Sequence, residues 1–208
     1  MANFLQFETV LPLIQSPEFI AAYKNYDYFI LPTLYNSPNG IHGVNHVRRT
    51  LLLSLLMASF DKLSIRHTRI LAYASVYHDI GRTHDGVDDY HGYASYQKAL
   101  EQGLLDSQET SDVCLVKELI ERHAISDPRA FSLETINEGM RKEVRFLLRY
   151  FKDADGLDRV RLGDLNVDYL RTGIARKMPL VAQKLLKFSG ENTSDYFINQ
   201  LGEKALKH

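Results

Sequence analysis

Histidine is the residue type whose placement in this chain points most directly to chemistry. Seven of the eight histidines fall within one interval, and only His208 lies outside it. The seven are His42, His46, His67, His78, His84, His91 and His123. Imidazole is a common ligand of transition metals and titrates near neutral pH. A cluster of this kind in helical surroundings therefore predicts a metal site or an acid–base site.

The adjacent pair His78-Asp79 is the most informative part of the cluster. It ends an apolar helical pattern and is followed by Ile80-Gly81-Arg82. Neighbouring residues on a helix point about 100° apart, so both side chains reach one cation only at the helix end, where other helices converge. A carboxylate adds negative charge there and can bridge two cations.

Two further segments accompany this pair. His46 stands near the start of an earlier helical pattern, and Asp155 stands near the end of a later one. The order of these residues resembles the H…HD…D pattern of the HD-domain superfamily of metal-dependent phosphohydrolases. The local sequences that carry the match are 42–49, 78–82 and 153–158. The resemblance covers roughly Ile41 to Arg161, more than half of the chain.

The resemblance implies an all-α helical bundle that holds one or two divalent cations, drawn from Mn, Fe, Zn, Mg, Co and Ni. The implied ligands of the first cation are His46, His78, Asp79 and Asp155. Dinuclear relatives, including cyclic-dinucleotide phosphodiesterases of the HD-GYP type, place two more histidines in this interval and bridge the ions with the Asp. His91 and His123 are the matching positions. The GYP signature is absent, so the substrate of that subfamily is not carried over.

Several neighbours compete for these roles. His42 lies four residues before His46 and is a candidate for the rim of the site. Asp153 and Asp158 flank Asp155, and Asp158 is placed to hydrogen-bond a ligand. The remaining histidines have plainer interpretations: His91 and His123 as surface residues of a mononuclear protein, His84 in a polar loop, and His67 at a solvated helix start.

Arg82 and Asp85 are the candidates for work on a substrate. A guanidinium at position 82 holds a phosphate through two parallel hydrogen bonds, or else forms a salt bridge with Asp85 or Asp88. Asp79 binds the cation and is placed to accept a proton from water, and Asp85 or His84 protonates the leaving oxygen. Weaker phosphate candidates are Arg49, Arg122 and Lys152. Four tyrosines are candidates to stack on a base of the substrate, or else to line the core: Tyr77, Tyr90, Tyr93 and Tyr96.

The function that this set predicts is hydrolysis of a phosphate ester on a nucleotide or another small phosphorylated molecule, by cation-activated water. One alternative is a di-iron oxygenase, because some HD-type relatives use the same ligands for iron. The other is a non-catalytic nucleotide-binding module. The identity of the bound metal and the product of the reaction, if there is one, distinguish these three functions.

The elements that position these residues are predicted to be helices, from the helical periodicity of the apolar positions. The predicted helices run from about 44 to 62, 70 to 79, 93 to 103, 113 to 123 and 144 to 155, with flanking helices at 16–31 and 179–201. Breaks are expected at 32–43, 81–89 and 126–137, and clear period-two alternation is hard to find. The sequence thus predicts one helical domain over 1–208, with a core at about 41–161.

Composition excludes several other classes. The 208 residues are 45% hydrophobic and 25% charged, with a net charge of −1, so no global basic field predicts a nucleic-acid partner. The most apolar segment, Leu51 to Phe60, is too short to span a bilayer, and the first residues lack a secretory signal. The single cysteine, Cys114, is expected to be buried, and a reducing, cytoplasmic setting fits it.

Overall fold

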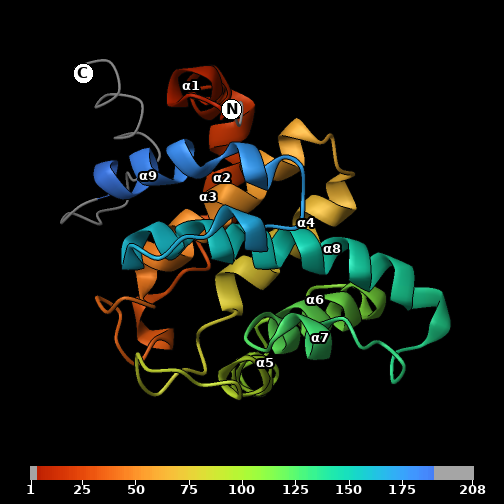
Figure 1. The fold of residues 1–208 in the computed structure, drawn as a ribbon. Helices are drawn as coiled ribbons and strands as arrows, with labels where there is room; N and C mark the ends of the chain where they lie inside the picture. Colours follow the sequence, from red (N-terminus) through yellow and green to blue (C-terminus); the bar gives the residue numbers. More distant parts are fainter. Residues whose placement is uncertain (1–3, 190–208) are drawn as a thin grey trace.

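The computed structural model describes residues 4–189, and the part of the chain that it describes is helical and contains no strand. The α-helices are α1 (Phe7–Ile14), α2 (Pro17–Asp27), α3 (Val44–Phe60), α4 (Ile65–Tyr77), α5 (His91–Glu101), α6 (Thr110–His123), α7 (Asp127–Ala130), α8 (Glu138–Leu157) and α9 (Pro179–Phe188). The short 3-10 turns are η1 (Pro32–Leu34), η2 (Asp158–Leu162), η3 (Val167–Tyr169) and η4 (Ala175–Lys177). The prediction of an all-α bundle is confirmed (Figure 1).

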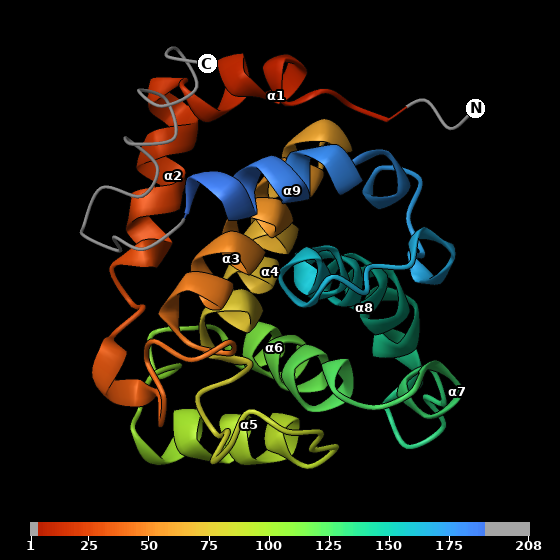
Figure 2. The ribbon, with the colours of Figure 1, turned by 60° about the vertical axis from the view of Figure 1, so that its left-hand side comes forward.

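Helix α3 lies at the centre of the bundle. Nearly all of its side chains are buried, on every face, as expected for a helix surrounded by others. Helices α2, α4, α8 and α9 pack against it, and Figure 2 shows α3 and α4 side by side in the middle of the molecule. The apolar run that begins at Leu51 is therefore the hydrophobic core of the domain.

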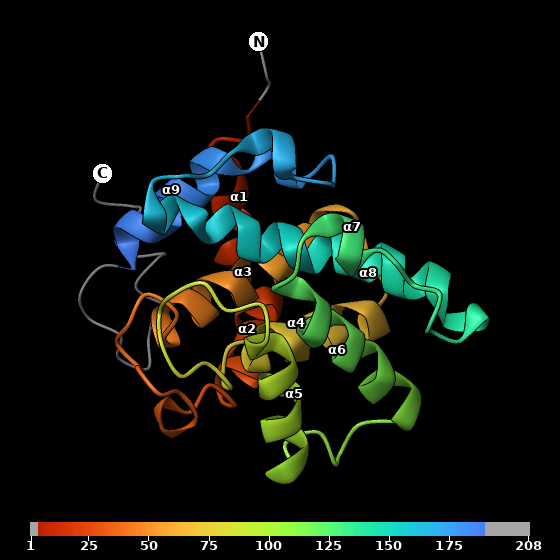
Figure 3. The same ribbon diagram turned by 60° about the horizontal axis from the view of Figure 1, so that its bottom comes forward.

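The helices around α3 are amphipathic and have defined ends. Helix α8 buries Val144, Leu147 and Phe151 and packs against α3, α4 and α6 (Figure 3). Ser64 caps α4 by accepting a hydrogen bond from the backbone N–H of His67 at 3.1 Å. Gly103 has a φ of 63° just after α5, a conformation that favours glycine and ends the helix.

The five predicted core helices are confirmed, with shifts of a few residues at their ends, and two helices were not predicted. Helix α1 contains Pro12, which interrupts the sequence signal of a helix only eight residues long. Helix α7 is a four-residue turn with proline near its start, inside the segment predicted as a break. The predicted flanking helix at 179–201 is observed as α9 up to Phe188, and the remainder lies outside the described residues.

The prediction that Cys114 is buried is wrong, because this residue is exposed on α6. The buried face of α6 is formed by Leu115, Leu119 and the residues one turn apart from them. Position 114 lies outside that face, so Cys114 is exposed although its neighbours in sequence are apolar.

Among the described residues, no helix combines the length and the apolar character needed to cross a membrane.

Candidate metal centre

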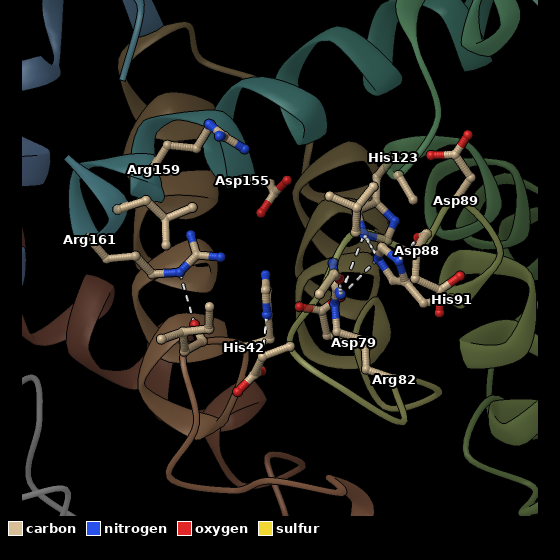
Figure 4. A pocket seen from close by; sticks show the side chains of 16 residues that line it. His42, Asp79, Arg82, Asp88, Asp89, His91, His123, Asp155, Arg159 and Arg161 are labelled. Carbon is tan, nitrogen blue, oxygen red and sulfur yellow. Dashed lines mark hydrogen bonds and ion pairs between the residues drawn. The ribbon is translucent and has the colours of Figure 1, made fainter. Parts of the chain in front are cut away.

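Five helix ends bring the predicted ligands together. The first turns of α3 and α5 supply His46 and His91, the end of α6 supplies His123, and the last turn of α8 supplies Asp155. The pair His78-Asp79 directly follows α4. These positions span more than 100 residues of sequence, and the packing of α3, α4, α6 and α8 brings them together. Asp79, His91, His123 and Asp155 line one cavity (Figure 4), and His46 and His78 are buried beside Asp79.

Two groups of potential ligands share one carboxylate. His46, His78 and Asp79 form the first trio, and Asp79, His91 and His123 form the second; within each, one ligand atom per residue lies within 4.8 Å of the others. All five side chains are buried. Such a density of titratable groups in the interior is costly unless each group has a partner of opposite charge.

The two oxygens of Asp79 face different histidine pairs. Oδ2 lies 3.4 Å from Nε2 of His46 and 3.5 Å from Nε2 of His78. Oδ1 lies 3.1 Å from Nε2 of His91 and 3.7 Å from Nε2 of His123. This arrangement has the geometry of a carboxylate that bridges two cations, one beside each pair.

The other ring nitrogen, Nδ1, of each of these histidines lies against a hydrogen-bond acceptor. The acceptors are Asp158 Oδ2 for His46 at 2.8 Å, the Ser75 carbonyl for His78 at 2.8 Å, the Ile120 carbonyl for His123 at 2.6 Å, and the Asp88 carbonyl for His91. A carbonyl or carboxylate oxygen only accepts, so Nδ1 carries the proton in all four rings. Nε2 of each ring is then the atom that faces Asp79.

The Nε2 atoms face one another at hydrogen-bond distance. They are 3.0 Å apart in His46 and His78, and 2.9 Å apart in His91 and His123. Two lone pairs at this distance repel unless a proton or a cation lies with them. Burial lowers the pKa of His78 to about 3 and also lowers that of His123, so both rings are neutral at pH 7. The donor set therefore fits divalent cations.

The carboxylates of the site are ionised. Burial opposes this, but the surrounding imidazoles, His78 first for Asp79 and His46 first for Asp155, hold both pKa values well below the usual range. Asp155 Oδ1 lies 3.4 Å from His46 Nε2, and 30% of its side chain is exposed to the cavity. Asp155 belongs to neither trio, so its role as a ligand stays a prediction.

Asp158 orients His46 in the way that the sequence suggested. It accepts the Nδ1 proton of His46 and is held by the guanidinium of Arg49, at 2.6 Å to Nε and 3.0 Å to Nη2. Asp153 serves a different purpose, since its carboxylate accepts the backbone N–H groups of Arg171 and Thr172. Asp158 thus orients a ring of the site, and Asp153 holds the backbone at residues 171 and 172 in place.

A cavity of about 310 Å³ opens over the two trios. Arg82 lies in its wall, with Nε 3.0 Å from Asp79 Oδ1 and Nη1 donating to the Gly86 carbonyl at 3.1 Å. The salt bridge expected with Asp85 or Asp88 is thus made with Asp79. Asp85 instead lies 3.1 Å from His42 Nδ1 at the cavity rim, and burial lowers the pKa of His42 to about 4.

Sequence reasoning missed Arg159 and Arg161, which also line this cavity. Figure 4 shows Asp155 between these arginines and the Asp79 group. Arg161 is fixed by bonds to the carbonyls of Ile41 at 2.8 Å and Asp158 at 3.2 Å. The signal that could have revealed them is the presence of two basic residues within six positions of Asp155.

Most of the weaker candidates are engaged elsewhere. Arg49 binds Asp158, Arg122 binds Glu118, and Lys152 binds backbone carbonyls at the end of α6. Tyr77 and Tyr96 are buried and Tyr90 and Tyr93 are exposed outside the cavity of the two trios. His67 contacts Glu143, and the ring of His84 accepts the N–H of Gly86.

Comparison of the chain with family models, with curated proteins and with solved structures found no match. The function must therefore be argued from the site itself.

Proposed function

We propose that this protein is a phosphohydrolase that depends on divalent cations and acts on a small phosphorylated molecule such as a nucleotide, as a phosphomonoesterase or phosphodiesterase. One observation carries the proposal: the Nε2 atoms of four imidazoles converge on the two oxygens of a single buried carboxylate, Asp79.

The residues divide into two binding positions. His46 and His78 hold one cation with Asp79, joined by Asp155, and His91 and His123 hold the other. Bound cations lower the pKa of a coordinated water and neutralise charge on the phosphoryl oxygens. The hydrogen bonds at Nδ1 fix each ring so that Nε2 keeps its direction.

The cavity wall supplies positive charge for a phosphate. Two nitrogens of Arg82 are fixed by Asp79 and Gly86, which leaves Nη2 to donate to a phosphate oxygen. Arg161 adds a second, buried guanidinium on the opposite side of Asp155 (Figure 4). Positive charge fixed in advance stabilises the charge that develops during phosphoryl transfer.

A proton donor for the leaving oxygen is also present at the rim. We assign this role to Asp85, which lies on the cavity and is held by the ring of His42. With 41% of its side chain exposed, Asp85 is also in contact with solvent.

The test is elemental analysis of protein purified without chelators, combined with phosphate release from a panel of phosphate esters. We expect about two equivalents of Mn, Mg, Zn, Co or Fe per chain, and loss of activity and of at least one equivalent of metal in His78→Ala. His91→Ala should lose one equivalent. A chain that binds no cation after each is added back would contradict the proposal.

Two results would replace the proposal with the alternatives. Iron together with oxygen consumption and no phosphate release would indicate an oxygenase. Bound cation and bound nucleotide without turnover would indicate a binding module.

A further inference from the structure

A second, larger cavity adjoins the metal centre. Its volume is about 710 Å³, within the range of about 300–1,000 Å³ that is usual for small-molecule sites. It lies between the end of α6 and residues 164–171. The residues that line both cavities are His123, Ala124, Asp155 and Arg159. A molecule held at the metal centre therefore reaches this adjoining cavity directly past Asp155.

Most charged groups in the adjoining cavity are already paired. Lys152 Nζ donates to the carbonyls of His123 and Ile125 at 3.0 and 2.6 Å. Arg171 binds the carboxylates of Asp127 and Asp153. These pairs leave no excess charge for an ionic group on a ligand.

The remaining polar groups at the mouth favour an uncharged ligand. Arg159 pairs with Asp164, and Arg176 Nε donates to the Leu170 carbonyl at 2.8 Å. The carboxylate of Asp168 also lines the cavity; together with Arg176 it contributes one negative and one positive charge. Hydroxyl and amino groups suit such a wall better than a second phosphate does.

An exposed aromatic ring also stands beside these groups. Tyr169 lines the adjoining cavity and is 75% exposed. Asn166 lines the same wall, and its Oδ1 accepts the backbone N–H of Asp168 at 2.9 Å. A ring that stacks, together with polar groups that hydrogen-bond, suits a flat, hydroxylated molecule.

Gly156 adds no side chain to the adjoining cavity. It follows Asp155 in the last turn of α8 and lines the cavity. A Cβ at position 156 would meet its nearest atom, Leu170 Cδ2, at 3.6 Å, an ordinary contact, so alanine fits here. A side chain longer than a methyl group at this position would extend into the space of the cavity.

Resting on the proposed function, we propose that the adjoining cavity holds the organic group of the phosphorylated substrate and that this group is an uncharged, hydroxyl-bearing ring system the size of a nucleoside. Gly156 leaves room for this group beside Asp155, and a side chain longer than a methyl group there would exclude it. The phosphate then lies at the metal centre, and the organic group extends past Arg159 towards Tyr169.

The test compares Gly156→Leu with Gly156→Ala on two kinds of substrate. Leucine projects into the cavity, whereas alanine removes the glycine without filling it. For Gly156→Leu we expect kcat/KM for nucleoside 5′-monophosphates to fall at least about tenfold, while kcat/KM for p-nitrophenyl phosphate and the metal content per chain stay within about twofold of wild type. Gly156→Ala should leave both substrates within about twofold. An equal change on the two substrates, at wild-type metal content, would overturn the inference.

A binding measurement separates this inference from the proposed function and covers the case in which Gly156→Leu disturbs Asp155. Titration calorimetry with unphosphorylated nucleosides should show binding to wild type that weakens about tenfold in Tyr169→Ala, the scale of one lost stacking contact. Nucleoside binding without hydrolysis of any ester would refute the proposed function and support the cavity assignment. Hydrolysis of p-nitrophenyl phosphate without nucleoside binding or substrate discrimination would support the proposed function and refute the cavity assignment.

Discussion

The carboxylate of Asp79 has two kinds of neighbour, because imidazoles approach both of its oxygens and Arg82 approaches one. Replacement by asparagine keeps the shape and removes the charge. The amide nitrogen of Asp79→Asn cannot ligate a cation, so at least one of the two positions loses its shared oxygen. We expect loss of at least one cation and a fall in kcat/KM of at least about 10²-fold. Metal analysis and phosphate-release assays check this, and Asp85→Asn is the control that should retain its metal.

His46 makes cation binding depend on pH. Burial and Arg161 disfavour its protonation, but hydrogen bonds to the carboxylates of Asp155, Asp158 and Asp79 outweigh them and raise its pKa from 6.5 to about 9 in the cation-free chain. A raised pKa stabilises the folded cation-free chain fully below pH 6.5, and this contribution is lost as the pH rises through about 9.

Cation binding follows the opposite direction, because the proton on His46 Nε2 must leave before that atom can act as a ligand. Affinity should rise about tenfold per pH unit between pH 6.5 and 8.5. Calorimetry in buffers of different ionisation enthalpy would also detect the released proton. Affinity that is flat over this range would show that His46 is not a ligand.

The resemblance of the sequence to the H…HD…D pattern predicted which residues converge, and it also implied that Asp79 stands between the pair His46 and His78 and the pair His91 and His123. It did not predict the presence of Arg161 in the cavity wall. That position depends on the packing of the turn after α8, which local sequence pattern does not decide.

At the scale of the elements, one buried lysine on α8 links this helix to the end of α6 by hydrogen bonds. Lys152 Nζ donates to the carbonyls of His123 and Ile125 and lies 3.4 Å from Asp127. Burial lowers the pKa of Lys152, which shows the cost of placing a cation there. The carbonyls at the end of a helix carry partial negative charge and need such a partner.

Substitution of Lys152 by methionine keeps the length of the side chain and leaves these carbonyls unpaired. We expect the free energy of unfolding to fall by about 3 kcal/mol and the cation beside His123 to bind more weakly than the one beside His78. Urea denaturation and metal analysis measure the two effects. Lys142→Met, on the exposed face of the same helix, should change neither. Equal weakening of both cations would contradict a specific role at α6.

The elements themselves were predictable to the extent that they were long and periodic. Helix α8 shows a clear apolar face, whereas α7 has four residues and too few positions to show a period. The course of residues 81–89 over the cavity was not predictable, because tertiary contacts hold it: Asn36 Nδ2 donates to the Thr83 carbonyl at 2.8 Å, and Arg82 to that of Gly86.

At the scale of the whole molecule, the metal centre is also where several helices of the bundle meet. The residues of the two trios come from α3, α5, α6 and the turn after α4, so two bound cations together would join four segments of the bundle. In the cation-free chain the same residues bury two pairs of facing imidazole Nε2 atoms and an ionised Asp79. Cation binding should therefore stabilise the whole domain as well as activate it.

A ligand that binds only the folded state adds about 2.7 kcal/mol at a hundred times its Kd, which for a domain of this size raises Tm by about 5–10 °C. We expect this rise when Mn²⁺ or Zn²⁺ is added to chelator-treated protein, and reversal by chelator. His78→Ala should reduce the rise, because Asp79 and His46 alone do not complete the first trio while the trio of Asp79, His91 and His123 stays intact, whereas Arg82→Ala should keep the full rise, because a guanidinium is not a ligand. Thermal denaturation followed by circular dichroism measures all three proteins. A rise of equal size in His78→Ala would place the stabilising cation elsewhere on the molecule and remove the link between this centre and the cohesion of the fold.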